Sequence, residues 1–537
     1  MKLDRHPLLG VPYHYAPVSH TSPDSGPRSS KNHPAVGGVA TALPLAGRVT
    51  GRDTQHNQMD VKMHSMHRIA TWSRTALFAL LPMGNALALG PPTQEEDPVP
   101  EAQPSEEAGE ALFLRAGRLI IRPGEVLEGG KVLVRGGRIV AVGADLEAPV
   151  GVREINGDVI CSAFLDPWSA LGLSGTAATD TSTSAATRSV DSLDIYSSEH
   201  LRLDAVRAGV TTTRAQVGER SAIGGVGAVL RILPGLSTEQ AIVLEESNLA
   251  AAIGLSKKGR AVGVFDRLKD IDKLVQEIEG GQKYGEDQIE YRYDLEEWQK
   301  EIAEKEEELE KDFKKAKKDR EKDQKKAEDK GKDFKEKRYK EDKKPKAPRF
   351  DSDKEIMARA VDGELCLVVH ANRASELREL LKATEEFDRL RLVVVGGTAA
   401  LYVAEELAER HIPVIVWPAP FGTEGLDEYD GHDLSLAGRL DEAGVEVLIG
   451  SGGGANASRD LPLLAGLAIG HGLPREEAFA ALTERAAQVF DVADHLGAVE
   501  VGNDAELLVL DGEPLVSTTH VQYVVTGGQL AVTPEDR

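Results

Sequence analysis

The amino-acid sequence predicts an α/β fold, in which a (β/α)8 TIM-like barrel is joined to a β-sandwich and carries a charged helical insertion. Three observations support this prediction. Apolar strand segments alternate with helical segments over residues 164–495, short β segments lie on both sides of that core, and a long charged run interrupts it. Continuous apolar strands separated by helices indicate a parallel sheet covered by helices. The number of strand–helix units favours a closed barrel over an open sheet.

Short β segments at the two ends of the folded part predict the β-sandwich. They fall in residues 111–163 and 496–537, and the Gly-Gly turns at Arg135–Arg138 and Thr526–Gln529 predict hairpins. The expected strands are Leu112–Ile121, Lys131–Arg135, Arg138–Val142, Glu154–Ile160, Glu506–Asp511, His520–Thr526 and Gln529–Val532. We expect the two ends of the chain to pair into one β-sandwich.

The core, residues 164–495, is expected to form the barrel. Apolar runs predict strands, and apolar residues at helical spacing predict the helices between them. The expected strands are Val210–Arg214, Leu365–His370, Leu392–Val395, Val414–Trp417 and Val445–Gly450, and the expected helices are Glu199–Ala208, Ala374–Phe387, Ala399–Arg410 and Leu434–Ala443. Such a barrel carries its chemistry at the C-terminal ends of its strands.

A charged insertion interrupts the core at residues 284–349. It consists almost entirely of Glu, Lys, Asp and Arg, with Trp298, Ile302, Leu309 and Phe313 along one face of a predicted helix. Pro345 and Pro348 end the helix. Two interpretations remain open: an arm that contacts a protein partner through a coiled coil, and a solvated helix without a partner.

The N-terminal region has the pattern of an exported protein. Basic residues, an apolar run and the small-x-small pattern Ala86-Leu-Ala88 predict a signal peptide at about residues 66–88, within a leader that spans residues 1–88. A translation start near Met59, Met63 or Met66 would place this signal first, and a disordered leader with a short anchoring helix is the alternative. The run is too short for a stable transmembrane anchor. Residues 89–110 predict an acidic, Pro-rich linker, and the mature protein is expected in the periplasm or outside the cell.

Composition excludes one class of partner. The net charge of −24 argues against nucleic acid, because phosphate binding needs clustered Lys and Arg. The chain has two cysteines, Cys161 and Cys366, which could form one disulfide or remain two buried thiols.

Several motifs resemble the amidohydrolase superfamily. These are Gly136-Gly-Arg-Ile-Val-Ala-Val-Gly143, Phe164-Leu-Asp-Pro-Trp-Ser-Ala-Leu-Gly172, Ala208-Gly-Val-Thr-Thr-Thr213 and Leu496–Leu510, in the family's order. The run Ile223-Gly-Gly-Val-Gly-Ala228 and the helical insertion are similar to the imidazolonepropionase-like branch. The resemblance implies a β/α barrel with a β-sandwich and hydrolysis of non-peptide carbon–nitrogen bonds. It also implies one or two divalent metals, held by His and carboxylate ligands, that activate water.

The positions that match the family's metal ligands are mostly occupied by residues that cannot bind a metal. The resemblance places the first His-x-His pair at Trp168 and Ala170, and the later His and Asp ligands at Gly396 and Gly452. His370 stands at a ligand position, and Asn372 stands where this branch often has a second His. We therefore expect no cofactor, unless a rebuilt site holds zinc or another divalent metal.

Four residues remain as candidates for a site. Asp166 and His370 could form a catalytic acid–base pair. Asn372 and Ser451, the latter in a glycine-rich loop at a strand end, could bind a substrate or an anion.

Three functions remain open on this evidence. The first is a non-catalytic binding or assembly protein whose metal centre is lost, with a protein partner or an active paralogue bound through the charged arm, and with a possible homo-oligomer. The second is an active hydrolase of cyclic amides, imidazolone-like rings or dipeptides that uses a rebuilt site. The third is a structural envelope protein.

Overall fold

The computed structural model describes residues 111–175, 177–254, 263–328, 343–419 and 433–536, with only the backbone for residues 306–328. The predicted leader, signal peptide and linker lie outside the described residues. Within the described ranges, no helix is both long enough and apolar enough to cross a membrane.

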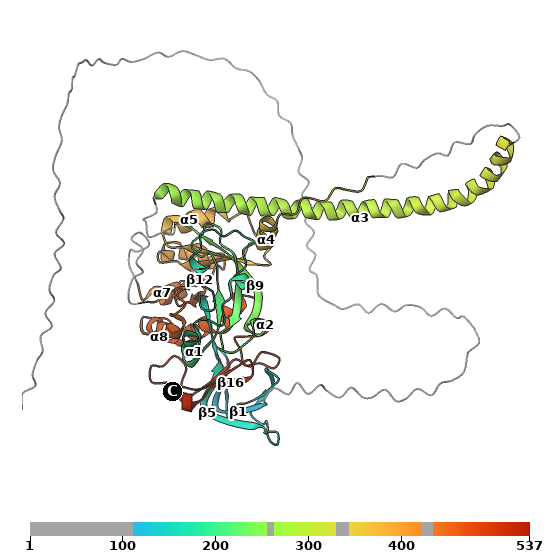
Figure 1. Ribbon diagram of the computed structural model, residues 1–537. Coiled ribbons are helices and arrows are strands. Elements are labelled where there is room, and N and C mark those ends of the chain that lie inside the picture. Colours follow the sequence, from blue (N-terminus) through green and yellow to red (C-terminus); the bar gives the residue numbers. More distant parts are fainter. Residues whose placement is uncertain (1–110, 176, 255–262, 329–342, 420–432, 537) are drawn as a thin grey trace, which may run out of the picture. The chain divides into compact units, whose positions relative to one another are not determined.

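The central sheet contains eight strands and forms a nearly closed barrel (Figure 1). Alternate strand residues face opposite sides: Val393 and Val395 pack inside the barrel, whereas Leu392 and Val394 pack outward against the helices. The strand order is β6 (Phe164–Ser169), β7 (Val210–Ala215), β8 (Val226–Arg231), β9 (Ile242–Ala252), β10 (Cys366–Ala371), β11 (Leu392–Gly396), β12 (Val414–Val416) and β13 (Val447–Ile449).

One strand departs from the predicted (β/α)8 repeat. Strand β8 runs antiparallel to both β7 and β9, whereas the other neighbouring pairs in this sheet are parallel. A parallel connection needs a crossover of a dozen or more residues, and residues 216–225 between β7 and β8 contain no helix. The backbone of this connection is tightly packed. A Cβ atom on Gly225 would lie only 2.3 Å from the Thr187 carbonyl oxygen. The expectation of an all-parallel barrel is therefore wrong at this strand.

Helices cover the outer side of the barrel and join most of its strands. They are α1 (Glu199–Arg207), α2 (Thr238–Ala241), α4 (Ser352–Val361), α5 (Ala374–Ala383), α6 (Ala404–Glu409), α7 (Leu436–Glu442), α8 (Leu461–Gly470), α9 (Arg475–Leu482) and α10 (Glu484–Val489), with 3-10 turns η1 (Ala177–Thr179), η2 (Ser189–Ser192), η3 (Ala400–Val403), η4 (Ser458–Asp460) and η5 (Pro534–Asp536).

The two ends of the described chain meet in a second sheet. Its path is β16-β15-β14-β5-β1-β3-β4, with β2 beside β1, so hydrogen bonding joins these strands into one sheet. The junction between the chain ends is the antiparallel pair β5 and β14. The strands are β1 (Leu112–Arg122), β2 (Glu125–Glu128), β3 (Lys131–Arg135), β4 (Arg138–Gly143), β5 (Arg153–Ser162), β14 (Leu507–Leu510), β15 (Val521–Thr526) and β16 (Gln529–Val532).

Both cysteines are buried free thiols, Cys161 in β5 and Cys366 in β10. A disulfide between them is thus excluded in this fold. Burial raises the pKa of Cys366 to about 11 and that of Cys161 further still, so both remain protonated at neutral pH.

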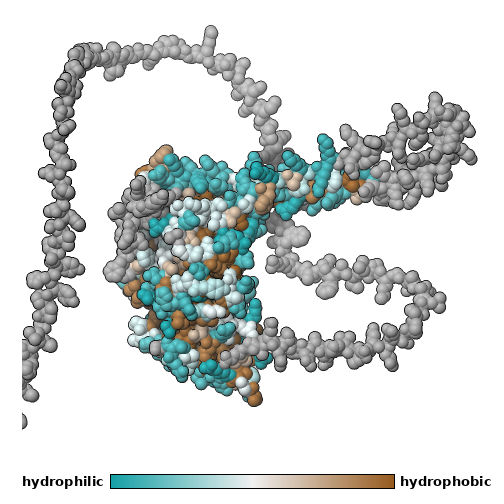
Figure 2. Space-filling model, in the orientation of Figure 1, coloured by the Kyte–Doolittle hydropathy of each residue, from teal (hydrophilic) through white to brown (hydrophobic). Residues whose placement is uncertain are grey.

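The charged insertion belongs to a helix longer than predicted. Helix α3 spans Val264–Glu328 and begins well before residue 284. Its first turns bury Ile271, Leu274 and Ile278, and Arg267 pairs with the buried Glu376 of α5. Farther along, α3 extends away from the other helices, and its coloured surface is mostly hydrophilic (Figures 1 and 2). The helix is therefore anchored by its first third.

Barrel and second sheet are joined by a buried ion-pair network. Arg231 at the end of β8 donates from Nε to Glu506 Oε1 at 2.6 Å and from Nη2 to Asp504 Oδ2 at 2.9 Å. Only 12% of the Arg231 side chain and 3% of the Glu506 side chain are exposed. Glu506 Oε1 also accepts from the Gly527 backbone amide at 2.7 Å. This network thus links the barrel to the residues before β14 and after β15.

We predict that Arg231→Met lowers the free energy of unfolding by about 3 kcal/mol, because it leaves a buried carboxylate without its charged partner. Urea unfolding followed by circular dichroism measures this change. The matched control is Arg115→Met, whose pair with Glu154 has side chains 38% and 44% exposed, and it should cost less than about 1 kcal/mol. Equal losses in the two variants would contradict the assignment of the junction to Arg231.

Candidate functional site

The structure brings the predicted site residues together at one end of the barrel. Asp166 lies on β6, His370 is near the end of β10 and Asn372 directly follows that strand. Gly396 ends β11, and Ser451 follows β13. Because these strands are parallel, their C-terminal ends meet at the same edge of the sheet. These candidate residues therefore lie at one edge of the barrel, and their roles stay predictions.

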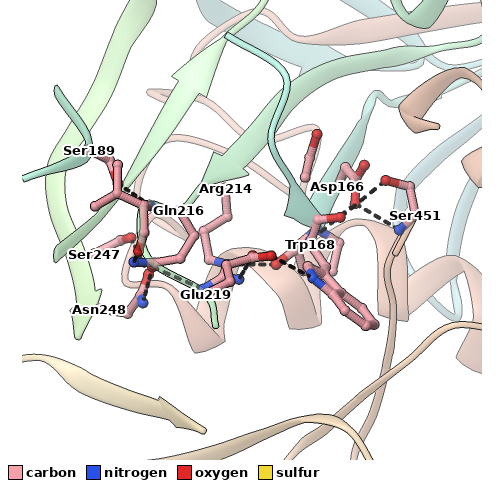
Figure 3. Close-up of polar contacts among 12 residues, drawn as sticks. Asp166, Trp168, Ser189, Arg214, Gln216, Glu219, Ser247, Asn248 and Ser451 are labelled. Atoms are coloured by element: carbon pink, nitrogen blue, oxygen red, sulfur yellow. Dashed lines mark hydrogen bonds and ion pairs between the residues drawn. The ribbon is translucent and has the colours of Figure 1, made fainter. Parts of the chain in front are cut away.

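Trp168 lies between Glu219 on one side and Asp166 with Ser451 on the other (Figure 3). Its indole ring lies edge-to-face against the His370 ring, with the centroids 5.1 Å apart. Its Nε1 donates a hydrogen bond to Glu219 Oε2 at 3.2 Å. Trp168 is buried, with 6% of its surface exposed. A bulky indole thus stands at the position where the family resemblance places the first histidine ligand.

Asp166 is fully buried and joins β6 to the loop after β13. Its Oδ1 accepts hydrogen bonds from the backbone amides of Trp168 and Ser451, each at 3.1 Å. Its Oδ2 accepts from Ser458 Oγ at 2.8 Å. Burial raises the pKa of Asp166, while these hydrogen bonds oppose that change. Among the described contacts none joins Asp166 to His370, so the predicted acid–base pair has no direct hydrogen bond.

His370 and Asn372 form a neutral pair in the barrel. Asn372 Nδ2 lies 3.5 Å from His370 Nε2. Burial and the positive charges of Arg220 and Arg214 lower the pKa of His370 to about 3, so the imidazole is neutral at physiological pH. Asn372 Oδ1 is buried and has no hydrogen-bond partner in the described part of the chain. An unpaired amide oxygen beside a neutral imidazole is a polar feature that a ligand could satisfy.

Two glycines leave no space for the missing ligand side chains. Gly396 has φ +88°, and a Cβ atom there would lie 2.4 Å from Asn372 Oδ1 and 3.0 Å from His370 Nε2. Gly452 has φ +91°, and its Cβ atom would lie 2.7 Å from the ring of Trp417. An L-residue would be strained at both positions and would collide with neighbours. A histidine or aspartate therefore cannot enter either position without a rearrangement of the site.

Sequence reasoning missed two charged residues, Arg214 and Glu219 (Figure 3). Arg214 is the last residue but one of β7, its side chain is 1% exposed, and its Nε donates to the Pro167 carbonyl oxygen at 2.7 Å. Its Nη2 lies 3.5 Å from Glu219 Oε1, and its guanidinium stacks 5.3 Å from the Phe490 ring centroid. An arginine within the strand run Val210–Ala215 was the signal available, because a charge inside a buried strand requires a partner.

Glu219 is the group in this cluster that titrates near neutrality. Burial raises its pKa from the ordinary 4.5 to about 7, while Arg214 and the Trp168 hydrogen bond oppose this rise. The amide network beside it is neutral and fully paired: Asn248 Nδ2 donates to Gln216 Oε1 at 2.8 Å, and Gln216 Nε2 donates to two backbone carbonyls. The Glu219 carboxyl group can thus exchange its proton at physiological pH.

The side chains present do not match a divalent metal site. Within the described ranges, no three His, Cys, Asp or Glu residues are grouped so as to hold a metal ion. Both oxygens of Asp166 already accept hydrogen bonds, and Trp168 separates His370 from Glu219. A zinc centre usually takes at least three protein ligands. The donor set here is a neutral imidazole, an amide, an indole and one arginine-paired carboxyl group.

Comparisons with known proteins agree with the fold and the motifs. The family model described as "Amidohydrolase family" matches residues 428–533. The structure of an amidohydrolase from Thermotoga maritima MSB8 is similar, with a TM-score of 0.57 and 21% sequence identity, over 79% of this chain and 100% of that chain. A. niger ochratoxinase is similar at a TM-score of 0.44 and 15% identity, over 79% of this chain and 97% of that one. A search of curated proteins finds no match.

The fold is an α/β barrel joined to a second sheet. The family model matches the C-terminal part of the chain, and the motifs along the chain resemble those of the amidohydrolase superfamily. Members of this family usually bind a divalent metal, and the residues described here do not fit one. The likeness to the imidazolonepropionase-like branch stays a prediction.

We predict that the fluorescence of Trp168 titrates with a midpoint near pH 7, because its indole N–H donates to Glu219. The folded state holds this proton more tightly than the unfolded state, since the pKa is raised. The resulting stabilisation is complete below about pH 4.5 and is lost as the pH rises through about 7.

Three variants isolate this titration. Glu219→Gln and Trp168→Phe should each abolish the fluorescence change, whereas Trp417→Phe should keep it. A transition that persists unchanged in Glu219→Gln would show that another group is responsible.

Proposed function

We propose that this protein is a non-catalytic member of the amidohydrolase superfamily that works as a binding or assembly protein. The single observation that carries the proposal is the placement of Trp168 between His370 and Glu219. The indole stands at the position where the family resemblance places the first histidine ligand. Without a metal to lower the pKa of a bound water, activation of water would depend on a general base alone.

The state of the remaining groups supports the same proposal. His370 is neutral, with its pKa near 3, so it cannot act as a general acid at physiological pH. Asp166 is engaged in joining β6 to the loop after β13. Glu219 has a suitable pKa for a general base, but it accepts from Trp168 and faces Arg214. Each of these three possible acid–base groups is thus already in contact with a neighbouring residue.

Helix α3 is the surface that we propose for partner binding. Its first third is anchored on the barrel, whereas Glu296, Glu297, Glu301 and Glu304 are exposed farther along. A charged helix that extends from a folded body can bind a protein partner at little cost to the body's own stability. An active paralogue or a second copy of this chain is a candidate partner.

We predict that the full-length protein, incubated with zinc and then dialysed, retains well below one metal ion per chain by mass spectrometry. It should also show no hydrolysis of N-acyl amino acids, cyclic amides or dipeptides beyond the His370→Ala variant with zinc, manganese or iron. Stoichiometric metal that is lost in His370→Ala, together with activity, would overturn the proposal in favour of a rebuilt hydrolase site.

Partner binding has its own test. Co-purification of the tagged full-length protein from its native cells should yield a partner that is lost when Glu296, Glu297 and Glu301 are changed to Lys. The matched control reverses two exposed charges in the connection between β4 and β5, Asp145→Lys and Glu147→Lys, and should retain the partner. A monomeric protein that co-purifies with nothing would contradict an assembly role.

A further inference from the structure

An apolar groove lies away from the barrel mouth, between α8 and the segment that connects β14 to β15. Its volume is about 830 Å³. One wall is formed by Leu463 and Leu467 of α8, and the opposite wall by Leu515 and Val516. Ligand pockets in proteins occupy about 300–1,000 Å³ and are mostly apolar. The groove therefore has the size and lining of a small-molecule site.

Helix α8 is apolar on its outer side as well as its inner side. Its sequence, LPLLAGLAIG, contains no charged residue, and Leu461, Leu464, Ala465 and Ala468 are buried against the core. On the outer side, 64% of Leu463 is exposed. A surface helix normally carries polar residues on its outer face, so an apolar outer face indicates that something covers it. Apolar surface is visible over this part of the molecule in Figure 2.

The opposite wall is held in a conformation that leucine rarely adopts. Leu515 has φ +60°, in the left-handed region. For a residue other than glycine this conformation costs on the order of 1 kcal/mol or more, and such strain concentrates at binding sites. The strained turn places Leu515 and Val516 in the lining of the groove.

Positive charge surrounds this apolar lining. Arg207, Arg459 and Arg475 line the groove, and none of the residues described as lining it carries a carboxylate. Arg207 approaches Asp204 at 3.6 Å, and Arg459 approaches Asp204 at 3.9 Å and Asp460 at 3.6 Å, which are loose, exposed ion pairs. Arg475 donates to the Pro514 carbonyl oxygen at 3.3 Å and has no carboxylate partner in the described part of the chain. Arg475 therefore offers a positive charge to an anion at the apolar lining.

We propose that this groove binds a long-chain fatty acid, with the alkyl chain along α8 and the carboxylate at Arg475. Burial of an alkyl chain supplies most of the affinity, because each buried methylene is removed from water. A charge-assisted hydrogen bond from the guanidinium selects the carboxylate over an uncharged head group. The site is separate from the barrel mouth and does not depend on the function proposed above.

A substitution at Gly466 would block the groove without straining the backbone. Gly466 lies in α8 and lines the groove, and a Cβ atom there would meet nothing within 4 Å. Gly466→Phe would thus place a ring in the groove. Gly280 in α3 is also helical with nothing within 4 Å of its Cβ position, so Gly280→Phe is the matched control for folding.

Isothermal titration calorimetry of the full-length protein with sodium dodecanoate, below its micelle concentration, tests the proposal. We expect saturable binding at one site per chain, weaker binding of dodecanol and no binding of butyrate. Arg475→Gln should weaken dodecanoate binding by about tenfold or more and leave dodecanol binding unchanged. Gly466→Phe should abolish binding, and Gly280→Phe should retain it.

Three outcomes would overturn the proposal. The first is the absence of saturable dodecanoate binding in the wild type. The second is equal binding in the wild type and Gly466→Phe. The third concerns oligomeric state. If the wild type sediments as a dimer and does not bind dodecanoate, and if Gly466→Phe sediments as a monomer, the occupant of the groove is a second copy of the chain.

Discussion

The carboxylate of Asp166 connects the first strand of the barrel to the loop after the last one, and the site is arranged around this connection. Between β13 and β6 the structure has hydrogen bonds from the Ser451 amide to Asp166 and from the Gly453 amide to the Trp168 carbonyl, at 3.1 and 3.0 Å. A buried carboxylate that accepts three hydrogen bonds holds two backbone segments at a defined distance. Trp168 and Ser451 therefore acquire their positions from the same group.

The side chains that fill the site depend on one another for their packing. Trp168 packs on His370, Asn372 fills the space over Gly396, and Trp417 fills the space over Gly452. Because protein interiors are close-packed, a larger side chain at either glycine requires its neighbour to become smaller. This interlocking fills the barrel interior with no side chain at Gly396 or Gly452. It is the packing observation on which the proposal of a non-catalytic protein rests.

Much of the fold could be predicted from the sequence, because apolar periodicity and turn residues are local. The strands at Leu392–Val395 and Val210–Arg214 are found within a residue or two of their observed limits. Strands β8 and β9 were not among the predicted strands, and the direction of β8 could not be predicted, since an apolar run looks the same in parallel and antiparallel sheets. The start of α3 was missed because its first turns bury one apolar face with Ile271, Leu274 and Ile278, unlike the charged part that defined the insertion.

The sequence by itself, through its resemblance to a known family, placed Trp168, His370 and Gly396 at the ends of expected strands. It could do so because motifs, apolar strand runs and side-chain alternation are local patterns. Only the tertiary structure decided what those side chains do. Glu219 lies in a loop and acquires its raised pKa from burial beside Trp168 and opposite Arg214. Burial and pairing depend on segments far apart in the chain, and no local pattern encodes them.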